Sequence, residues 1–134
     1  MQKKIAIVAS EFNKEYVDGL LAHCQRELRG HPTLTVRVPG AYEIPLLAQR
    51  LLQRKDIAAV IAFGVIWQGQ TAHADLIASA VTNRLMALSL KFDKPVIHQV
   101  LDVRNERQAR ARCLGKKLNR GVEGARAALK MLEL

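Results

Sequence analysis

The sequence predicts an α/β protein, a three-layer α/β/α sandwich in which a four-stranded parallel sheet has helices on both faces. Four short apolar runs occur along the chain, and each is followed by a stretch with helical periodicity. The runs are almost unbroken, which indicates strands buried on both faces and joined by right-handed crossovers. A chain of 134 residues with 49% hydrophobic composition has room for one cored domain, so we expect a single domain over residues 1–134.

The expected strands lie at residues 4–9, 34–38, 58–63 and 95–101, and their alternation with helices favours a doubly wound, flavodoxin-like topology. The expected helices lie at residues 14–29, 43–54, 72–91, 106–114 and 121–132. The third helix offers an apolar surface broader than the single stripe that would cover one side of a sheet. We therefore expect its second face to pack against a neighbouring subunit; the alternative is a long helix buried within its own monomer.

Composition and charge limit the classes of protein to which this chain can belong. The net charge of +9, concentrated in residues 104–126, fits phosphorylated metabolites or nucleic acid. Because that region has no aromatic residue for base stacking, nucleic-acid binding is not expected. No apolar stretch is long enough for a membrane span, and the first is too short for a signal peptide, so we expect a cytoplasmic protein. The cysteines and histidines show no metal-ligand spacing, so we expect structural thiols, no metal and no cofactor.

Chemically distinctive residues follow the predicted strands, where ligands bind in doubly wound sheets. The stretch 64–73 is the most informative, because glycine followed by Gln70 and Thr71 at a helix start presents free backbone amides to an anion. It predicts a phosphate site. Its spacing nearly matches a nucleotide-binding P-loop, but Gln70 stands where lysine is required and the bulky Trp67 where small residues are usual. Nucleotide binding is retained as an alternative.

Several single residues suit chemistry at that edge of the sheet. His73 lies in the first helical turn, where the helix dipole favours a neutral imidazole that can accept a proton. Phe12 can stack on a planar heterocycle beside the hydrogen-bonding Asn13. Glu43 can accept bonds from polyol hydroxyls, and Arg112 can bind phosphate through two parallel bonds. Each also has a plain structural interpretation, so these residues alone indicate only a phosphate- and ring-binding α/β protein with a candidate base.

The ordered motifs indicate more than the single residues do. They are Ser-Glu-Phe-Asn at 10–13, Val-Pro-Gly-Ala-Tyr-Glu-Ile-Pro at 38–45, the stretch 64–73, Pro-Val-Ile-His at 95–98, and Gln-Ala at 108–109 with Arg112 and Asn-Arg-Gly at 119–121. Together they resemble the lumazine synthase family over nearly the whole chain. The run at 38–45 is the most specific.

The resemblance implies an enzyme that condenses 5-amino-6-(D-ribitylamino)uracil with 3,4-dihydroxy-2-butanone 4-phosphate. The product would be 6,7-dimethyl-8-ribityllumazine, in the penultimate step of riboflavin biosynthesis, formed through an imine with elimination of phosphate. It implies that His73 moves the protons. The implied pyrimidine and ribityl contacts are Phe12, Asn13, Gly40, Ala41, Tyr42, Glu43, Val65, Ile66, Trp67, His98 and Arg120, and the implied phosphate ligands are Gln70, Thr71 and Arg112.

The chain departs from the family pattern at a few of these positions. Arg120 stands where lysine is usual, and His98 where a phenylalanine reaches into a neighbour's site. Trp67 and Gln68 replace a smaller apolar residue and an arginine. The resemblance also implies a homo-oligomer built from pentamers and association with riboflavin synthase. The alternative is a catalytically impaired paralogue that acts as a binding or shell-forming protein.

Overall fold

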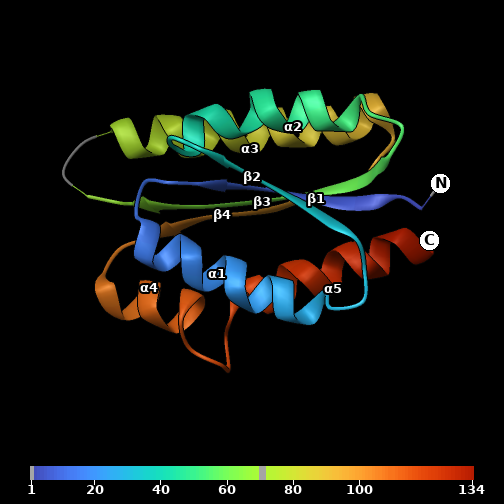
Figure 1. The fold of residues 1–134 in the computed structure, drawn as a ribbon. Helices are drawn as coiled ribbons and strands as arrows, with labels where there is room; N and C mark the ends of the chain where they lie inside the picture. The colour runs from blue at the N-terminus through green and yellow to red at the C-terminus, as the bar shows by residue number, and fades with distance from the viewer. Residues whose placement is uncertain (1, 70–71) are drawn as a thin grey trace.

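The computed structural model describes residues 2–69 and 72–134 and has a central sheet with helices above and below it (Figure 1). The strands are β1 (Lys4–Ser10), β2 (Thr33–Val38), β3 (Ile57–Trp67) and β4 (Val96–Val103). They pair in the order β2-β1-β3-β4, and every pairing is parallel. The predicted four-stranded parallel sheet of flavodoxin-like type is therefore confirmed.

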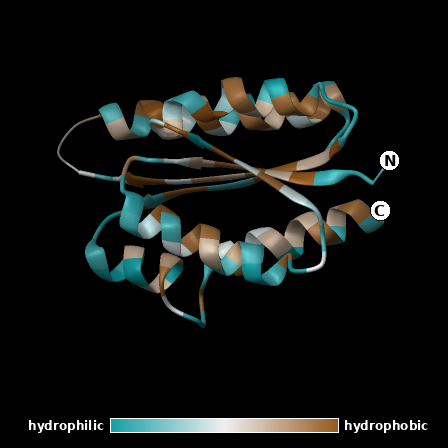
Figure 2. Cartoon of the chain, in the orientation of Figure 1, coloured by the Kyte–Doolittle hydropathy of each residue, from teal (hydrophilic) through white to brown (hydrophobic). Residues whose placement is uncertain are grey.

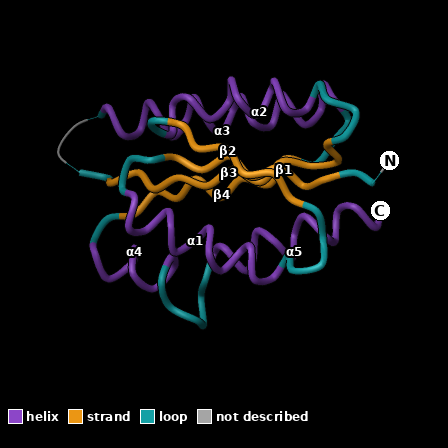
Figure 3. The backbone as a smooth tube through the Cα atoms, viewed as in Figure 1, coloured by secondary structure: helices purple, strands orange, loops and turns teal. Residues whose placement is uncertain are grey.

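The helices divide between the two faces of the sheet (Figures 1 and 3). On one face lie α2 (Ile44–Leu52), preceded by the short 3-10 helix η1 (Ala41–Glu43), and α3 (His73–Phe92). On the other lie α1 (Lys14–Glu27), α4 (Glu106–Cys113) and α5 (Arg120–Glu133). These bounds agree with the predicted helices to within a few residues at each end, which is the usual uncertainty of helix ends.

Two apolar cores, one on each face of the sheet, hold the layers together. In β1, Ile5 and Ile7 pack toward α1, α4 and α5, whereas Ala6 and Val8 pack toward α2 and α3. All four side chains are at most 4% exposed. Because both faces of the central strands β1 and β3 are buried, these two strands are apolar at nearly every position, as Figure 2 shows for the centre of the sheet. The edge strands β2 and β4 are only partly buried and carry polar residues, so the expectation of burial on both faces was wrong for them.

The third strand is longer than predicted. It pairs with β4 as far as Trp67↔Val103, whereas the prediction ended it at residue 63 and took Gly64 as the start of a loop. That prediction was wrong, because Gly64 lies inside the strand and serves close packing. A Cβ atom there would lie 3.3 Å from Cγ1 of Val100 and 3.4 Å from Cδ1 of Ile44. The longer strand carries the residues from Val65 to Trp67 to the edge of the sheet.

One face of α3 is uncovered in the single chain. Val81, Leu85 and Leu88 are buried against the sheet, but Leu76 and Leu90 are 67% and 75% exposed. The alternative of a helix buried wholly within its own monomer is therefore wrong. Even with these apolar side chains exposed, none of the helices in the described ranges is long and apolar enough to span a membrane.

Candidate active site

A cavity of about 350 Å³ opens beside the carboxyl ends of β1 and β3. The chain leaves β1 toward β2 on one side and later returns to β3 on the other, so the strand order reverses between β1 and β3. Ligands of doubly wound sheets bind at this type of position. The lining residues are Ser10, Phe12, Gly40, Ala41, Tyr42, Glu43, Val65, Ile66, Trp67, His73, Ala74 and Ile77.

The cavity brings together predicted residues from four places in the chain: the β1–α1 loop, the β2–α2 connection, the end of β3 and the start of α3. Sequence reasoning missed Ser10, Ala74 and Ile77 as lining residues. Ile77 had a usable signal, because it lies four positions after His73 and therefore on the same helical face. Ser10 also had a signal, because it opens the motif at 10–13 after the first strand, but no role was assigned to it; the structure buries it.

Two exposed aromatic rings border the cavity. Phe12 is 70% exposed and Tyr42 is 67% exposed, so neither ring belongs to the core of the single chain. An aromatic ring held at a cavity and open to solvent can stack on a planar heterocycle with little rearrangement. Phe12 therefore has the environment that its predicted role requires, and its plain interpretation as a core residue is wrong.

His73 is the first residue of α3; it is exposed and lines the cavity. Its imidazole is therefore at the surface of the site rather than in the protein interior, as a general acid or base must be. Glu43 lines the same cavity from the end of η1. Gln70 and Thr71, the predicted phosphate ligands before His73, lie outside the described residues.

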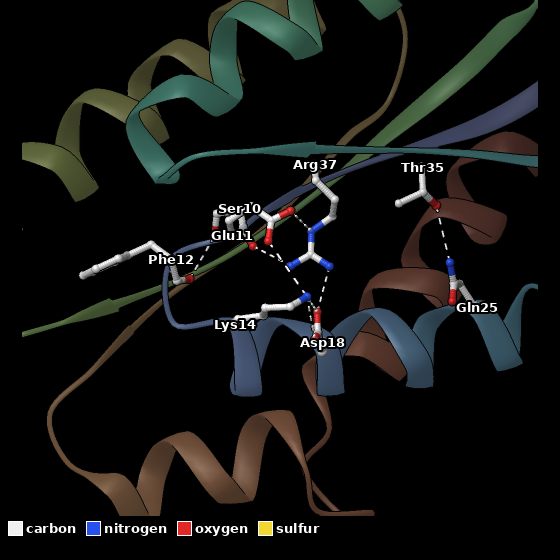
Figure 4. Close-up of polar contacts among 8 residues, drawn as sticks. All are labelled: Ser10, Glu11, Phe12, Lys14, Asp18, Gln25, Thr35 and Arg37. Atoms are coloured by element: carbon white, nitrogen blue, oxygen red, sulfur yellow. Dashed lines mark hydrogen bonds and ion pairs between the residues drawn. The ribbon is translucent and has the colours of Figure 1, made fainter.

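The loop that carries Phe12 is held by Arg37 of β2 (Figure 4). The guanidinium donates 2.7 Å and 2.9 Å hydrogen bonds, from Nη1 to Oδ1 of Asp18 and from Nη2 to the carbonyl oxygen of Ser10. Its Nε lies 3.7 Å from Oε1 of Glu11. Arg37 therefore links the end of β1, the loop after it and helix α1.

Backbone hydrogen bonds hold the same loop to the end of β2. The amide of Glu11 donates to the carbonyl of Val38 at 2.7 Å, and the amide of Phe12 donates to the carbonyl of Pro39 at 3.0 Å. The loop therefore continues the pairing of β1 with β2 beyond the last paired residues, Ser10 and Val38. The position of the Phe12 ring depends on this backbone, because the exposed ring has little packing of its own.

The Arg37–Asp18 pair predicts a pH dependence of stability. The hydrogen bond from Arg37, aided by Lys14, lowers the pKa of the Asp18 carboxyl. A lowered folded-state pKa contributes stability that is present above the ordinary carboxyl pKa of about 4 and is lost as pH falls through the folded value. Asp18→Asn should therefore lower the free energy of unfolding at neutral pH, by less than about 1 kcal/mol because the side chain is 44% exposed.

Urea denaturation between about pH 5 and pH 2 would measure this contribution. The stability difference between wild type and Asp18→Asn should shrink as the pH is lowered. Glu133→Gln is the matched control, because Glu133 is 71% exposed and lies 3.9 Å from Lys130 at the other end of the chain. A difference that stays constant over this pH range would contradict the assigned ion pair.

Four predicted site residues in the described part of the chain do not line the cavity: Asn13, His98, Arg112 and Arg120. The side chain of Asn13 bonds instead to the carbonyl of Val65 and the indole of Trp67. Arg112 lies in the last turn of α4, and Arg120 begins α5 with its Nη1 3.4 Å from Oε1 of Glu123. Both helices cover the face of the sheet opposite α3 (Figure 1). His98 lies on β4, and its Nε2 is 2.8 Å from Oγ1 of Thr82.

His98 is held in one tautomer by its own chain. Its Nδ1 accepts a 3.1 Å hydrogen bond from the amide of Val100, so the ring proton resides on Nε2, where it is donated to Thr82. Burial lowers the pKa of His98. The neutral ring is therefore favoured, and its planar face remains an aromatic surface in place of the phenylalanine expected at this position.

Both cysteines belong to the apolar core that α1, α4 and α5 form with the sheet. Cys24 and Cys113 are buried with free thiols, and burial raises the pKa of each to about 12. A thiol with such a pKa is protonated at neutral pH and is therefore a poor nucleophile. Over residues 2–69 and 72–134, no three His, Cys, Asp or Glu side chains are grouped so as to hold a metal ion.

Comparison with known proteins gives a consistent result over the whole chain. A family model described as 6,7-dimethyl-8-ribityllumazine synthase matches residues 2–134. A protein of that name from Cytophaga hutchinsonii is 40% identical over 94% of this chain and 82% of its own length. Proteins of the same name from Coxiella burnetii and Thermus thermophilus are 36% and 35% identical over 98% of this chain, covering 90% and 87% of their own lengths.

Proposed function

Because the chain belongs to the 6,7-dimethyl-8-ribityllumazine synthase family, we propose that the cavity at the ends of β1 and β3 is its active site. The enzyme is a transferase of riboflavin biosynthesis. It condenses 5-amino-6-(D-ribitylamino)uracil with 3,4-dihydroxy-2-butanone 4-phosphate to form 6,7-dimethyl-8-ribityllumazine. The observation that carries the assignment of the site is that an exposed aromatic ring, Phe12, and the His73 imidazole line one cavity at the point where the strand order reverses.

The pyrimidine substrate suits the side of the cavity formed by β1, η1 and β3. Its planar ring would stack on Phe12. The polar atoms at the edge of that ring would contact the backbone at the end of β3, from Val65 to Trp67. The ribityl chain would run along residues 40–43, where the Glu43 carboxylate and the backbone offer acceptors for its hydroxyls. The small residues Gly40 and Ala41 leave room for that chain.

The reaction requires several proton transfers in this cavity. The pyrimidine amine attacks the ketone carbon and loses water to give an imine; a carbon then loses a proton as phosphate leaves. That carbon bears the hydroxyl next to the imine, so elimination leaves an enol, which tautomerises to a new ketone. The second amine attacks this ketone to close the ring, and a second water is lost. We assign the proton transfers to His73, because general acid–base catalysis contributes about 10²–10⁴-fold and requires a side chain at the reacting atoms. Holding the two substrates side by side would supply much of the remaining acceleration.

The residues that lie away from the cavity point to a neighbouring subunit. We propose that His98, Arg112 and Arg120 complete the site of an adjacent copy in a homo-oligomer built from pentamers. The exposed apolar face of α3 supports this arrangement, since an apolar surface of that kind favours burial against another chain. A hollow beside the cavity, lined by Tyr42, His73, Leu76, Ile77 and Ala80, extends the same surface up to the site.

The proposed phosphate ligands are Arg112, with Gln70 and Thr71 before α3. A guanidinium can bind a phosphate through two parallel charge-assisted bonds, which suits the leaving group of the ketone substrate. We further propose a cytoplasmic enzyme that takes small-molecule substrates and associates with riboflavin synthase, which would use its product. Co-purification of the two proteins would test that association.

The decisive experiment is an absorbance assay on the purified protein. Mixing the two substrates with enzyme should produce the lumazine chromophore faster than mixing them alone. A nucleotide-binding protein would instead gain thermal stability with ATP or GTP, and a non-catalytic shell protein would retain RNA in a salt-sensitive way without forming the chromophore. The nucleotide alternative is not favoured, because Gly64 lies within β3 and does not begin a phosphate-wrapping loop.

Arg112→Ala should affect the KM values of the two substrates differently. Losing a charge-assisted bond to phosphate should raise the KM for the phosphorylated ketone by about 10- to 100-fold and change the KM for the pyrimidine little. Steady-state kinetics with each substrate varied in turn would measure this. Arg107→Ala, which removes an exposed arginine from the same helix, is the matched control. Equal losses for both substrates would contradict the phosphate role.

A further inference from the structure

The side chain of Asn13 bonds to the protein at both ends of its amide. Its Nδ2 donates a 2.6 Å hydrogen bond to the carbonyl of Val65, and its Oδ1 accepts a 3.0 Å hydrogen bond from Nε1 of Trp67. The backbone of Asn13 is left-handed, with φ 57° and ψ 45°. Asparagine tolerates this conformation better than most residues, and here the two hydrogen bonds help to hold it.

Trp67 is itself held in place. It is the last residue of β3, is partly buried and lines the cavity. Its ring meets the ring of Tyr16 edge-on, with 5.7 Å between centroids and 80° between planes. The amide of Tyr16 in turn donates to the carbonyl of Asn13 at 3.1 Å. The indole, the loop and the first turn of α1 therefore form one connected unit.

This unit fixes one side of the loop that carries Phe12. On the side toward the N-terminus, the loop is held by Arg37 and by the bonds to Val38 and Pro39. On the other side, the residue directly after Phe12 is Asn13, whose side chain is held by the end of β3. Because the Phe12 ring is 70% exposed, these backbone restraints rather than ring packing determine where it lies.

We propose that Trp67 is a positioning residue for the pyrimidine subsite: its indole N–H holds Asn13, and Asn13 fixes the backbone that carries the Phe12 ring. This inference rests on the proposed function. Trp67 replaces a smaller residue of the family pattern. Under this proposal its function is to donate a hydrogen bond and not only to fill space. The proposal also makes Asn13 primarily a link between the loop and β3, with one N–H and one lone pair left for the ribityl chain.

Trp67→Phe tests the proposal, because it keeps an aromatic ring beside Tyr16 while removing the N–H donor together with part of the indole. Loss of this bond leaves the Asn13 oxygen without its partner and loosens the loop, so the KM for the pyrimidine should rise about 3- to 10-fold. The KM for the phosphorylated ketone and the kcat should stay within about twofold. Tyr16→Phe is the matched control, since it removes one polar group from the neighbouring ring without touching the Asn13 bond.

A double-mutant cycle identifies Asn13 as the intermediary. Asn13→Gly keeps the left-handed backbone accessible while removing the side chain, so adding Trp67→Phe to it should change the pyrimidine KM no further. A further rise in KM in the double variant, equal to that in the single one, would overturn the proposal. An equal rise in both KM values for Trp67→Phe, or a fall in its kcat alone, would also overturn the proposal. Either result would show that the substitution disturbs the whole site rather than the pyrimidine subsite.

Trp67 is the only tryptophan in the sequence, so its fluorescence gives a readout independent of activity. In the free enzyme, Asn13→Gly should shift the emission maximum, because the indole N–H loses its acceptor; an unchanged spectrum would overturn the proposal even if Trp67→Phe did not fold. The proposed function and the proposed role of Trp67 can be contradicted separately. A wild type that forms no chromophore would contradict the proposed function, whereas normal chromophore formation with an unchanged pyrimidine KM in Trp67→Phe would contradict only the role of Trp67.

Discussion

Replacing His73 with alanine is expected to lower the kcat of lumazine formation by about 10²-fold or more, the largest effect on activity of any single substitution in the cavity. The side chain is exposed at the start of α3 and lines the cavity, so its removal should not disturb the core. A group that acts on protons in the transition state lowers kcat and leaves the KM values nearly unchanged when it is lost. Initial rates with both substrates at saturation would measure the effect.

The matched control is His31→Ala, which removes another exposed histidine from the loop before β2 and should leave the rate unchanged. Imidazole added to the buffer should restore part of the lost rate to His73→Ala but not accelerate the wild type. A variant that keeps more than about half of the wild-type kcat would remove His73 from the mechanism. The catalysis would then rest on substrate proximity alone.

The largest expected loss of stability comes from Gly121→Ala. The start of α5 packs directly on the backbone of α1, and a Cβ atom on Gly121 would lie closer to the carbonyl oxygen of Leu20 than real Cβ contacts allow. It would also lie 2.9 Å from Oδ1 of Asn119. Because the Leu20 neighbour is backbone rather than the tip of a flexible side chain, the two helices must move apart. We expect a loss of about 3 kcal/mol in the free energy of unfolding, or an insoluble protein.

The start of α5 is also sensitive because Asn119 connects it to α4. Asn119 is 2% exposed, and its Oδ1 accepts bonds from the amides of Gly121 and Val122. Its Nδ2 donates to the carbonyls of Cys113 and Gly115. A shift of α5 would therefore strain buried hydrogen bonds and displace Arg120, for which a role at a neighbouring site is proposed.

Thermal or urea denaturation would measure the Gly121→Ala effect against Gly69→Ala. A Cβ atom on Gly69 would meet no other atom within 4 Å, so that substitution should change the free energy of unfolding by less than about 0.5 kcal/mol. If Gly121→Ala were as stable as Gly69→Ala, the close approach of α1 and α5 would not exist in solution.

Much of the fold followed from local patterns in the sequence. Short β-branched or apolar runs predicted the four strands. The two central ones, β1 and β3, are apolar at nearly every position because both of their faces are covered. The motif at 38–45 and the position of His73 after β3 predicted a site at the carboxyl ends of the strands. Residues 40–43 of that motif and His73 line the cavity because parallel topology brings these ends to one edge of the sheet.

The errors arose where a local pattern has two meanings. Glycine after an apolar run is usual at the start of a loop, but it also occurs inside a strand where neighbouring elements approach closely. At Gly64 the second meaning holds, because Val100 of β4 and Ile44 of α2 occupy the space of a side chain. Nothing in the sequence near Gly64 distinguishes the two cases, since both neighbours are distant in the chain.

By itself the sequence determined the order and type of the elements, the rim of the cavity and the family, because these depend on apolar periodicity and on short motifs that are contiguous in the chain. Only the tertiary structure decided which side chains meet across the sheet. Trp67 and Asn13 are 54 positions apart, and their hydrogen bond depends on strand order and on how far β3 extends. The same holds for α4 and α5, whose place opposite α3 separates Arg112 and Arg120 from the cavity. The physical reason is that local patterns report burial and backbone preference, whereas contacts between distant residues depend on packing of the whole chain.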